Sequence, residues 1–186
     1  MFEFKEVGIE GVKLITPFFF EDGRGILKKT FEKRIFLENG IELDAMEELE
    51  TTSKKGVLRG LHFQTEHSQG KLIRVAKGKI YDVAVDLREN SSTFGKYFGT
   101  YLSFENKKML YIPAGFAHGC LILEQDTTFY YLCSQSYYAG FDSGIIWNDT
   151  DLNIKWPLDE VDKVILSEKD ANLQTLDQYI NGRQTK

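Results

Sequence analysis

Residues 71–87 read KLIRVAKGKIYDVAVDL, two β-rich runs joined by the turn sequence AKGK. Because side chains alternate along a strand, residues 80–87 divide into an apolar face and a mixed face. The apolar face holds Tyr81, Val83, Val85 and Leu87, and the mixed face holds Ile80, Asp82, Ala84 and Asp86. The mixed face carries two carboxylates, so it either faces solvent or lines a polar cavity. The stretch predicts two β-strands.

Similar β-rich runs follow one another along most of the chain. They include GVLRGLHF, KYFGTYLSF, KMLYIP, GCLILE and TTFYYLCSQSYY, and turn sequences such as EDGRG, SKKG, FENKK and PAG separate them. Their spacing of roughly 8–12 residues is typical of an all-β sandwich or barrel. No internal repeat or linker-like segment interrupts them, so residues 1–186 are predicted to form a single β-rich domain.

Helical patterns are confined to two places. A short helix is predicted over Lys33–Asn39, ending at Gly40. A stronger pattern lies in a C-terminal helical part, about residues 163–186. There Ser167 can be an N-cap with Asp170 at position N3, as in a capping box. The apolar residues that follow at helical spacing are Leu173, Leu176 and Ile180.

Composition excludes several classes of protein. Among 186 residues there are only three His and two Cys, which is too few for a zinc-finger array or a disulfide scaffold. A net charge of −5 argues against a nucleic-acid partner. No apolar run approaches the roughly 20 residues of a membrane helix, and the first residues do not resemble a signal peptide. We therefore expect a cytoplasmic protein in which Cys120 and Cys133 are reduced core residues.

The three histidines differ in their surroundings. His67 lies in the polar loop TEHSQG and is interpreted as a surface residue. His62 lies in the strand pattern RGLHF, close to basic residues, and His118 follows a Pro-Gly turn in IPAGFAHG. A metal site in a β-barrel usually needs three His or two His and a carboxylate. No H-x-H pair occurs, and Gln64 stands where a second His would be expected, so no metal is predicted.

Basic and phenolic side chains supply further candidates. Arg24, Arg59 and Lys71 each lie beside a glycine in a turn or at a strand edge. They are either solvated surface charges or part of a local basic pocket for a phosphate-bearing ligand. Residues 129–138 contain four tyrosines, of which Tyr131 and Tyr137 share a face if the strand has no bulge. A tyrosine in such a run is most often core, but one that points into a cavity can donate a proton.

An ordered set of motifs extends this interpretation. The runs VLRGLHFQ, QGKLIRVAKGKIYDVAVDLRENSSTFGKY, LSFENKKMLYIPAGFAHGCLIL, WNDTDLNIKWPL and LSEKD occur in order from about Thr16 to Asp170. Together they resemble the dTDP-4-dehydrorhamnose 3,5-epimerases. The resemblance implies a cupin-type double-stranded β-helix, or jelly roll, that usually forms a homodimer and uses no metal or cofactor. It also implies a nucleotide-linked 4-keto-6-deoxyhexose as substrate.

The resemblance implies roles for individual residues. His62 matches the general base, Asp170 the carboxylate that orients it, Lys71 the cation near the C4 oxygen, and Tyr131 the general acid. Further matches to positions around the nucleotide sugar are Arg24, Arg59, His118, Tyr137, Phe20 and Gln64. Asp170 then has two interpretations, because sequence periodicity alone favours the helix-capping role and the resemblance favours the partner of His62.

The implied chemistry explains these residue types. A ketone at C4 acidifies the hydrogens on C3 and C5, and removing one gives an enolate whose charge lies on the C4 oxygen. A cation placed there stabilises this charge. Inversion requires reprotonation from the opposite face of the ring, so a base such as His62 and a separate acid such as Tyr131 are both needed.

Some positions depart from the family pattern. Lys29 stands where relatives usually carry Glu, Glu47-Glu48-Leu49 replaces a pattern with two amides, and Leu132 replaces a frequent Lys. These departures leave the nucleotide and the sugar open. The alternatives are an epimerase acting at one carbon, an enzyme of CDP-, GDP- or UDP-sugars, a 3,4-ketoisomerase of the same fold class, and a non-catalytic sugar-nucleotide-binding cupin.

Overall fold

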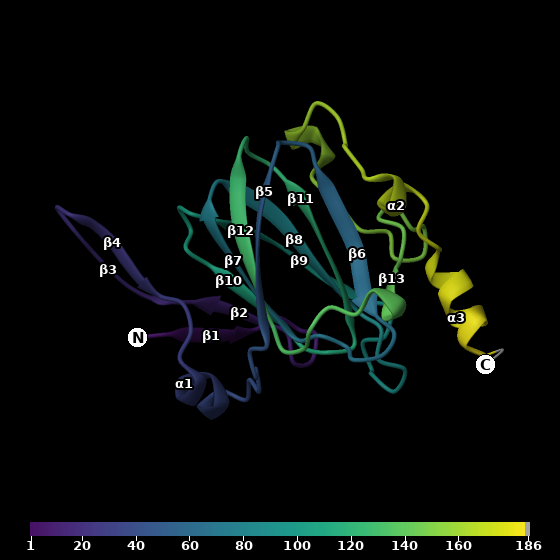
Figure 1. The fold of residues 1–186 in the computed structure, drawn as a ribbon, viewed down its shortest axis with the longest axis horizontal. Coiled ribbons are helices and arrows are strands. Elements are labelled where there is room, and N and C mark those ends of the chain that lie inside the picture. The colour runs from purple at the N-terminus through teal and green to yellow at the C-terminus, as the bar shows by residue number, and fades with distance from the viewer. Residues whose placement is uncertain (185–186) are drawn as a thin grey trace.

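Two antiparallel β-sheets face each other in the computed structural model, which describes residues 1–184 (Figure 1). In spatial order, the six-stranded sheet contains β1 (Glu3–Glu6), β2 (Lys13–Thr16), β10 (Met109–Ile112), β7 (Lys71–Lys77), β12 (Thr127–Cys133) and β5 (Glu47–Ser53). The five-stranded sheet contains β13 (Asp142–Gly144), β6 (Leu58–Gln64), β11 (Phe116–Ile122), β8 (Lys79–Asp86) and β9 (Tyr97–Ser103). This confirms the predicted all-β, cupin-type jelly roll.

The stretch at residues 71–87 joins the two sheets. Strand β7 belongs to the six-stranded sheet, and β8 belongs to the five-stranded sheet. The chain crosses between them at Gly78, whose φ is +80° and whose added Cβ would lie 2.2 Å from Thr127 Oγ1. A side chain at this turn is excluded both by its backbone conformation and by space.

The mixed face of β8 points inward. Ile80 and Ala84 pack between the sheets with Ile73 of β7 and Phe129 of β12. Asp82 and Asp86 lie on the same face and are fully buried. Of the two possibilities left open by the sequence, the carboxylates therefore line a polar part of the interior.

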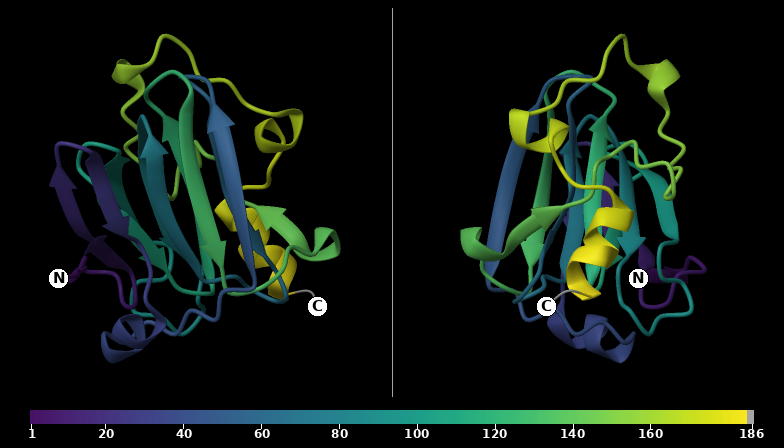
Figure 2. Two further views of the ribbon diagram at one scale, coloured as in Figure 1. Left: turned by 60° about the vertical axis from the view of Figure 1, so that its left-hand side comes forward. Right: turned by 90° about the vertical axis from the view of Figure 1, so that its right-hand side faces the viewer.

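The outer face of the five-stranded sheet is also covered. Val83, Val85 and Leu87 pack against the C-terminal part of the chain, including Trp156 and Leu176. Figure 2 shows this part of the chain running along the sheet. Because both faces of the sheet are covered, most residues of β8 and all residues of β11 are buried.

The helices differ in part from the expectation. Helix α1 (Lys33–Glu38) agrees within one residue with the predicted helix and buries Phe36. The C-terminal pattern forms two helices, α2 (Glu168–Ala171) and α3 (Leu176–Gln184), in place of one. Single 3₁₀ turns, η1 (Ala139–Phe141) and η2 (Leu158–Glu160), complete the helical structure of the described residues.

The break between α2 and α3 has a clear cause. The backbone carbonyl of Gln174 accepts a hydrogen bond from Ile146 N–H and is therefore drawn into pairing beside β13. The Asp149 carboxylate accepts a hydrogen bond at 2.8 Å from the N–H of Leu176, the first residue of α3. Residues 185–186 of the predicted helical part lie outside the described residues. None of the described helices is both long and apolar enough to span a membrane.

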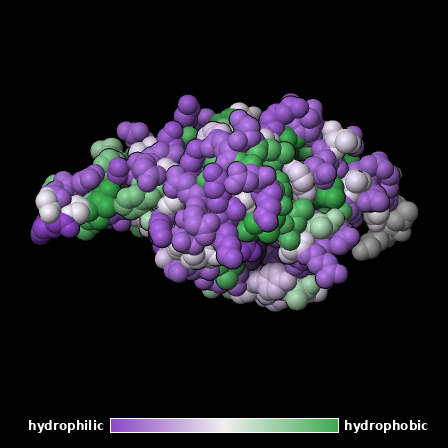
Figure 3. Space-filling model, turned by 90° about the horizontal axis from the view of Figure 1, so that it is seen from above, coloured by the Kyte–Doolittle hydropathy of each residue, from purple (hydrophilic) through white to green (hydrophobic). Residues whose placement is uncertain are grey.

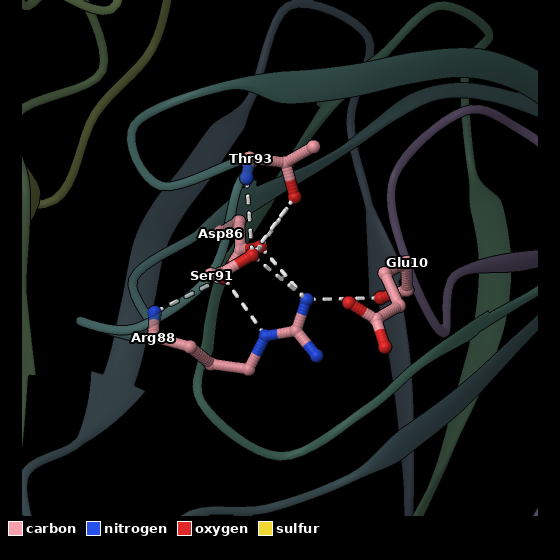
Figure 4. Close-up of polar contacts among 5 residues, drawn as sticks. All are labelled: Glu10, Asp86, Arg88, Ser91 and Thr93. Atoms are coloured by element: carbon pink, nitrogen blue, oxygen red, sulfur yellow. Dashed lines mark hydrogen bonds and ion pairs between the residues drawn. The ribbon is translucent and has the colours of Figure 1, made fainter.

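Asp86 anchors the loop that follows β8 (Figure 4). Its carboxylate accepts hydrogen bonds from the Arg88 guanidinium at 2.8 and 3.0 Å, from Ser91 at 2.5 Å and from Thr93 at 2.7 Å. Arg88 also donates to the backbone carbonyl of Glu10 at 3.0 Å. Burial raises the pKa of Asp86, but these donors outweigh burial and hold it well below its usual range.

A β-hairpin projects from the body of the molecule. It consists of β3 (Phe18–Asp22) and β4 (Gly25–Lys29), which pair with each other and with no other strand of the described residues. We call this hairpin the arm. Figures 1 and 3 show it extending away from the two main sheets, with apolar residues along its length. Its exposed apolar side chains are Phe18, Phe19, Phe20 and Leu27.

Candidate active site

A cavity of about 390 Å³ lies between the two sheets. Strand β5 contributes Leu49, Glu50 and Thr51 to its wall. The residues predicted to act on or bind the substrate that line it are Arg59, His62, Gln64, Lys71, His118, Tyr131 and Tyr137. The cavity thus brings together predicted residues that are up to 78 positions apart in the sequence, the separation of Arg59 and Tyr137.

His62 and Asp170 form a hydrogen-bonded pair at the edge of this cavity. His62 Nε2 lies 2.5 Å from Asp170 Oδ1, and Asp170 is buried while His62 is partly exposed. Burial raises the pKa of Asp170, but the hydrogen bond with His62 and its charge, together with Ser167, hold the pKa below the usual range. When an ionised Asp170 accepts a hydrogen bond from Nε2–H of His62, Nδ1 is left as the basic nitrogen of the ring.

Asp170 occupies position N3 of α2 and also contacts His62. Its backbone N–H donates to the side chain of Ser167, the N-cap of α2, at 3.0 Å. Its carboxylate turns toward His62. The capping interaction therefore fixes the backbone from which the carboxylate reaches His62.

Tyr131 lies across from Ile73 of β7 and Leu49 of β5 in the middle of β12. Its ring packs edge-on against His118, with 5.5 Å between the ring centroids. Burial, followed by the neighbouring Cys120 and Asp82, raises the pKa of the Tyr131 hydroxyl well above its usual value. The phenol therefore remains protonated at neutral pH, as a proton donor must.

Lys71 is the first residue of β7 and faces the same cavity. Burial lowers the pKa of its ammonium group, and the charges of Asp82, Asp142 and Glu47 oppose this effect. A desolvated cation interacts more strongly with a developing negative charge than a hydrated cation does. Lys71 is thus suited to stabilise an oxyanion inside the cavity.

The remaining predicted residues of the cavity make distinct contacts. His118 Nε2 lies 2.8 Å from Asp82 Oδ1, and Arg59 donates to Ser53 Oγ. Gln64 holds the following loops in place, because its amide donates to the carbonyls of His67 and Ser136 and accepts from the N–H of Tyr138. His67 itself is exposed and packs against Tyr138.

Tyr137 lies at the cavity for a different structural reason from the one predicted. Strand β12 ends at Cys133, so strand alternation does not place Tyr137 beside Tyr131. Its backbone N–H donates to Glu47 at 3.1 Å, and its hydroxyl donates to Asp142 at 2.8 Å. These two contacts hold its ring at the edge of the cavity with 54% of the residue exposed.

Arg24 and Phe20 lie away from the cavity of their own chain. Both are on the arm, where Arg24 forms an ion pair with Asp22 at 2.7 Å and Phe20 is 54% exposed. Lys29 is also on the arm and pairs with Glu32. One chain alone therefore does not bring these residues to the other predicted site residues.

Sequence reasoning missed an ion pair in the wall of the cavity. Asp142 of β13 and Lys169 of α2 line it and form an ion pair with each other. Lys169 directly precedes Asp170 in LSEKD, so its position in the sequence was a usable signal. Asp142 follows the tyrosine-rich run and carried no pattern of its own.

Metal-binding side chains and cysteine thiols are the remaining groups with chemical potential. Among residues 1–184 no group of three or more His, Cys, Asp and Glu side chains is arranged to hold a metal ion. Cys120 and Cys133 are free and lie buried in the core. Burial raises the pKa of Cys133 to about 11, so its thiol is neutral at physiological pH.

The cavity of this jelly roll gathers a histidine held by a carboxylate, a desolvated lysine and a protonated tyrosine, which are the groups that a proton-transfer enzyme requires. The model of the dTDP-4-dehydrorhamnose 3,5-epimerase family matches residues 6–178. The chain belongs to this family, which confirms the resemblance seen in the sequence.

Individual relatives agree with this assignment. The chain is 48% identical to the dTDP-4-dehydrorhamnose 3,5-epimerase of Methanothermobacter thermautotrophicus, covering 94% of this chain and 95% of the relative. It resembles the Legionella pneumophila dTDP-6-deoxy-D-glucose-3,5-epimerase, solved with dTDP-4-keto-L-rhamnose, with a TM-score of 0.92, 39% identity and coverage of 95% and 94%. A 3'-monoepimerase from Streptomyces bikiniensis, solved with dTDP-quinovose, is similar with a TM-score of 0.87, 30% identity and coverage of 95% and 89%.

Proposed function

We propose that the chain is an isomerase that inverts C3 and C5 of dTDP-4-dehydro-6-deoxyglucose and gives dTDP-4-dehydrorhamnose. The observation that carries this proposal is the convergence of the His62–Asp170 pair, Lys71 and Tyr131 on one cavity. The activities of the relatives suggest the substrate. The free thiols are consistent with action in the cytoplasm.

In the proposed mechanism, His62 removes the hydrogen next to the C4 ketone through Nδ1. Asp170 stabilises the imidazolium that forms, because its carboxylate accepts the hydrogen bond from Nε2. Lys71 stabilises the enolate oxygen, and the hydroxyl of Tyr131 delivers a proton to the opposite face of the sugar. His62 and Tyr131 reach the cavity from different sheets, which supports a base and an acid on opposite sides of the ring.

The direct test is conversion of the substrate. Purified protein incubated with dTDP-4-dehydro-6-deoxyglucose in H2O is expected to yield a product inverted at both C3 and C5, as read by NMR coupling constants. A substrate that stays unchanged contradicts the proposal. A thermal-shift comparison of dTDP, UDP, GDP and CDP identifies the nucleotide, because a bound ligand stabilises the folded state.

A one-carbon epimerase is the second candidate. The observation that favours it is the structural similarity to the Streptomyces bikiniensis 3'-monoepimerase, together with the departures at Glu47 and Leu49. Leu49 lines the cavity, and Glu47 holds Tyr137. A product of the same incubation inverted at C3 alone selects this candidate.

We also propose that the enzyme is a homodimer whose arm completes the cavity of the second copy. Arg24 and Phe20 match family positions around the substrate, yet both lie outside the cavity of their own chain. The exposed Phe side chains of the arm are the kind of surface that a second copy buries. An Arg supplied in this way can bind the diphosphate.

Mixing two inactive variants tests the exchange of arms. Arg24→Ala and His62→Gln chains, mixed and allowed to exchange subunits, would form heterodimers with one intact site. If half of the dimers are mixed, about a quarter of the wild-type activity returns. No regained activity, or full activity of Arg24→Ala alone, contradicts the shared site.

A further inference from the structure

Asp82 is a buried carboxylate beside the cavity for which the mechanism above has no use. It lies on β8, and its side chain is fully buried. Oδ1 lies 2.8 Å from His118 Nε2, but Oδ2 has no hydrogen-bond partner among the described residues. A buried carboxylate with an unsatisfied oxygen is costly to desolvate, so packing alone does not explain it.

His118 and His62 are direct neighbours. They are paired positions of the antiparallel strands β11 and β6, so their side chains lie on the same face of the sheet. Both line the cavity, and each has Nε2 on a buried carboxylate. Asp170 reaches His62 from α2, while Asp82 reaches His118 from the adjacent strand β8.

This repetition has a consequence for His118. A carboxylate that accepts a hydrogen bond from Nε2–H fixes the tautomer and the ring orientation of its histidine. Nδ1 of His118 is then directed away from Asp82, and the ring packs edge-on against Tyr131. Without this partner the imidazole could rotate or take the other tautomer.

We propose that Asp82 is a positioning residue that acts through His118, fixing its Nδ1 as a hydrogen-bonding atom toward the reacting sugar. The proposal rests on the epimerase function proposed above. In this arrangement the cavity presents two oriented imidazoles to one substrate. His62 carries the proton, and His118 holds a sugar oxygen beside it.

The test combines kinetics with the tautomeric state of His118. Asp82→Asn keeps the shape of the side chain and removes its charge, and is expected to lower kcat by about 10–100-fold with a smaller rise in KM. Only three histidines are present, so ¹H–¹⁵N NMR can follow each ring after assignment with single His→Gln variants. The wild-type spectrum is expected to show His118 protonated at Nε2, and the variant a changed pattern at His118 but not at His67.

A double mutant separates positioning from a direct effect on Lys71 or Tyr131. If Asp82 acts through His118, then Asp82→Asn adds less than about twofold to the loss already caused by His118→Gln. If the loss of kcat in the double mutant equals the product of the losses in the two single mutants, the proposal is overturned. An unchanged His118 spectrum in Asp82→Asn also overturns it. If the wild-type protein does not convert the sugar nucleotide, the epimerase function fails, but the spectrum still tests the Asp82–His118 contact.

Asp86→Asn is the matched control. Asp86 is a buried carboxylate on the same strand and the same face, but it does not line the cavity, and Arg88, Ser91 and Thr93 satisfy it (Figure 4). Its variant is expected to keep the wild-type kcat and the wild-type spectrum of His118. If Asp86→Asn lowers kcat as much as Asp82→Asn does, the loss comes from a general disturbance of the fold by removing a buried carboxylate of β8. That result would overturn the proposal.

Discussion

Asp82 and Asp86 stand on the same face of β8, and both are fully buried, but their surroundings differ. Asp86 accepts hydrogen bonds from an arginine and two hydroxyl groups, which tie the loop after β8 to the barrel. Asp82 has one partner, His118, and one unsatisfied oxygen. A buried carboxylate whose oxygens all accept hydrogen bonds is typical of a structural role. A buried carboxylate with an oxygen that accepts none is typical of a functional site. We therefore expect substitutions in the cavity to lower kcat and substitution of Asp86 to lower stability.

Among substitutions in the cavity, His62→Gln should cause the largest loss of kcat. The amide cannot accept the substrate hydrogen, so kcat should fall by up to about 10⁴-fold. His62 is partly exposed, and the melting temperature should change little. Product formation followed by NMR gives the rate, and circular dichroism gives the melting temperature. A variant that retains more than a tenth of the wild-type kcat would remove His62 as the base.

Lys71→Met should lower kcat by about 10²–10³-fold, because the enolate loses its cation. The pH profile adds a sharper test. Burial lowers the pKa of Lys71, so its charge is lost at a lower pH than that of an ordinary lysine near 10.4. The wild-type activity should therefore decline on the alkaline side below that pH, and the variant should lack this decline. An identical alkaline limb in both proteins assigns the decline to another group.

Tyr131→Phe should slow inversion by about 10²-fold while loss of hydrogen from the substrate continues. Removing the hydroxyl takes away the acid and leaves the His62–Asp170 pair intact. Solvent exchange and inversion are measured in the same NMR sample. Equal losses of the two rates would argue against separate roles for base and acid.

Asp86→Asn should leave kcat unchanged and lower stability by about 1–3 kcal/mol, because a buried network loses its charged acceptor. The pKa of Asp86 is depressed in the folded protein, so its contribution is present at neutral pH and is lost as the pH falls below about 4. Urea unfolding of both proteins at pH 7 and pH 3 measures this. A stability difference that grows toward pH 3 would contradict the assignment.

Much of the fold could be predicted because local patterns agree with tertiary packing. The alternation in residues 80–87 correctly divided β8 into two faces, since one face packs on the C-terminal part and the other on the interior. The prediction of one continuous C-terminal helix was wrong. Pairing of Gln174 beside β13 is a long-range interaction that helical spacing cannot reveal.

The site was predictable to a smaller extent. Motif order identified His62, Lys71 and Tyr131, but the Asp82–His118 contact depends on how β8 lies beside β11. Tyr137 reaches the cavity through Glu47 and Asp142, which come from other parts of the chain. Arg24 and Phe20 show a different limit, because no sequence pattern indicates that the arm places both residues outside the cavity of their own chain.

Exchange of the substrate hydrogens with solvent tests the central claim most directly. Wild-type protein and His62→Gln are incubated with dTDP-4-dehydro-6-deoxyglucose in D2O, and deuterium at C3 and C5 is read by NMR. We expect deuterium at both carbons with the wild-type protein and almost none with the variant. Absence of deuterium at both carbons with the wild-type protein, or equal rates in the two proteins, would contradict it.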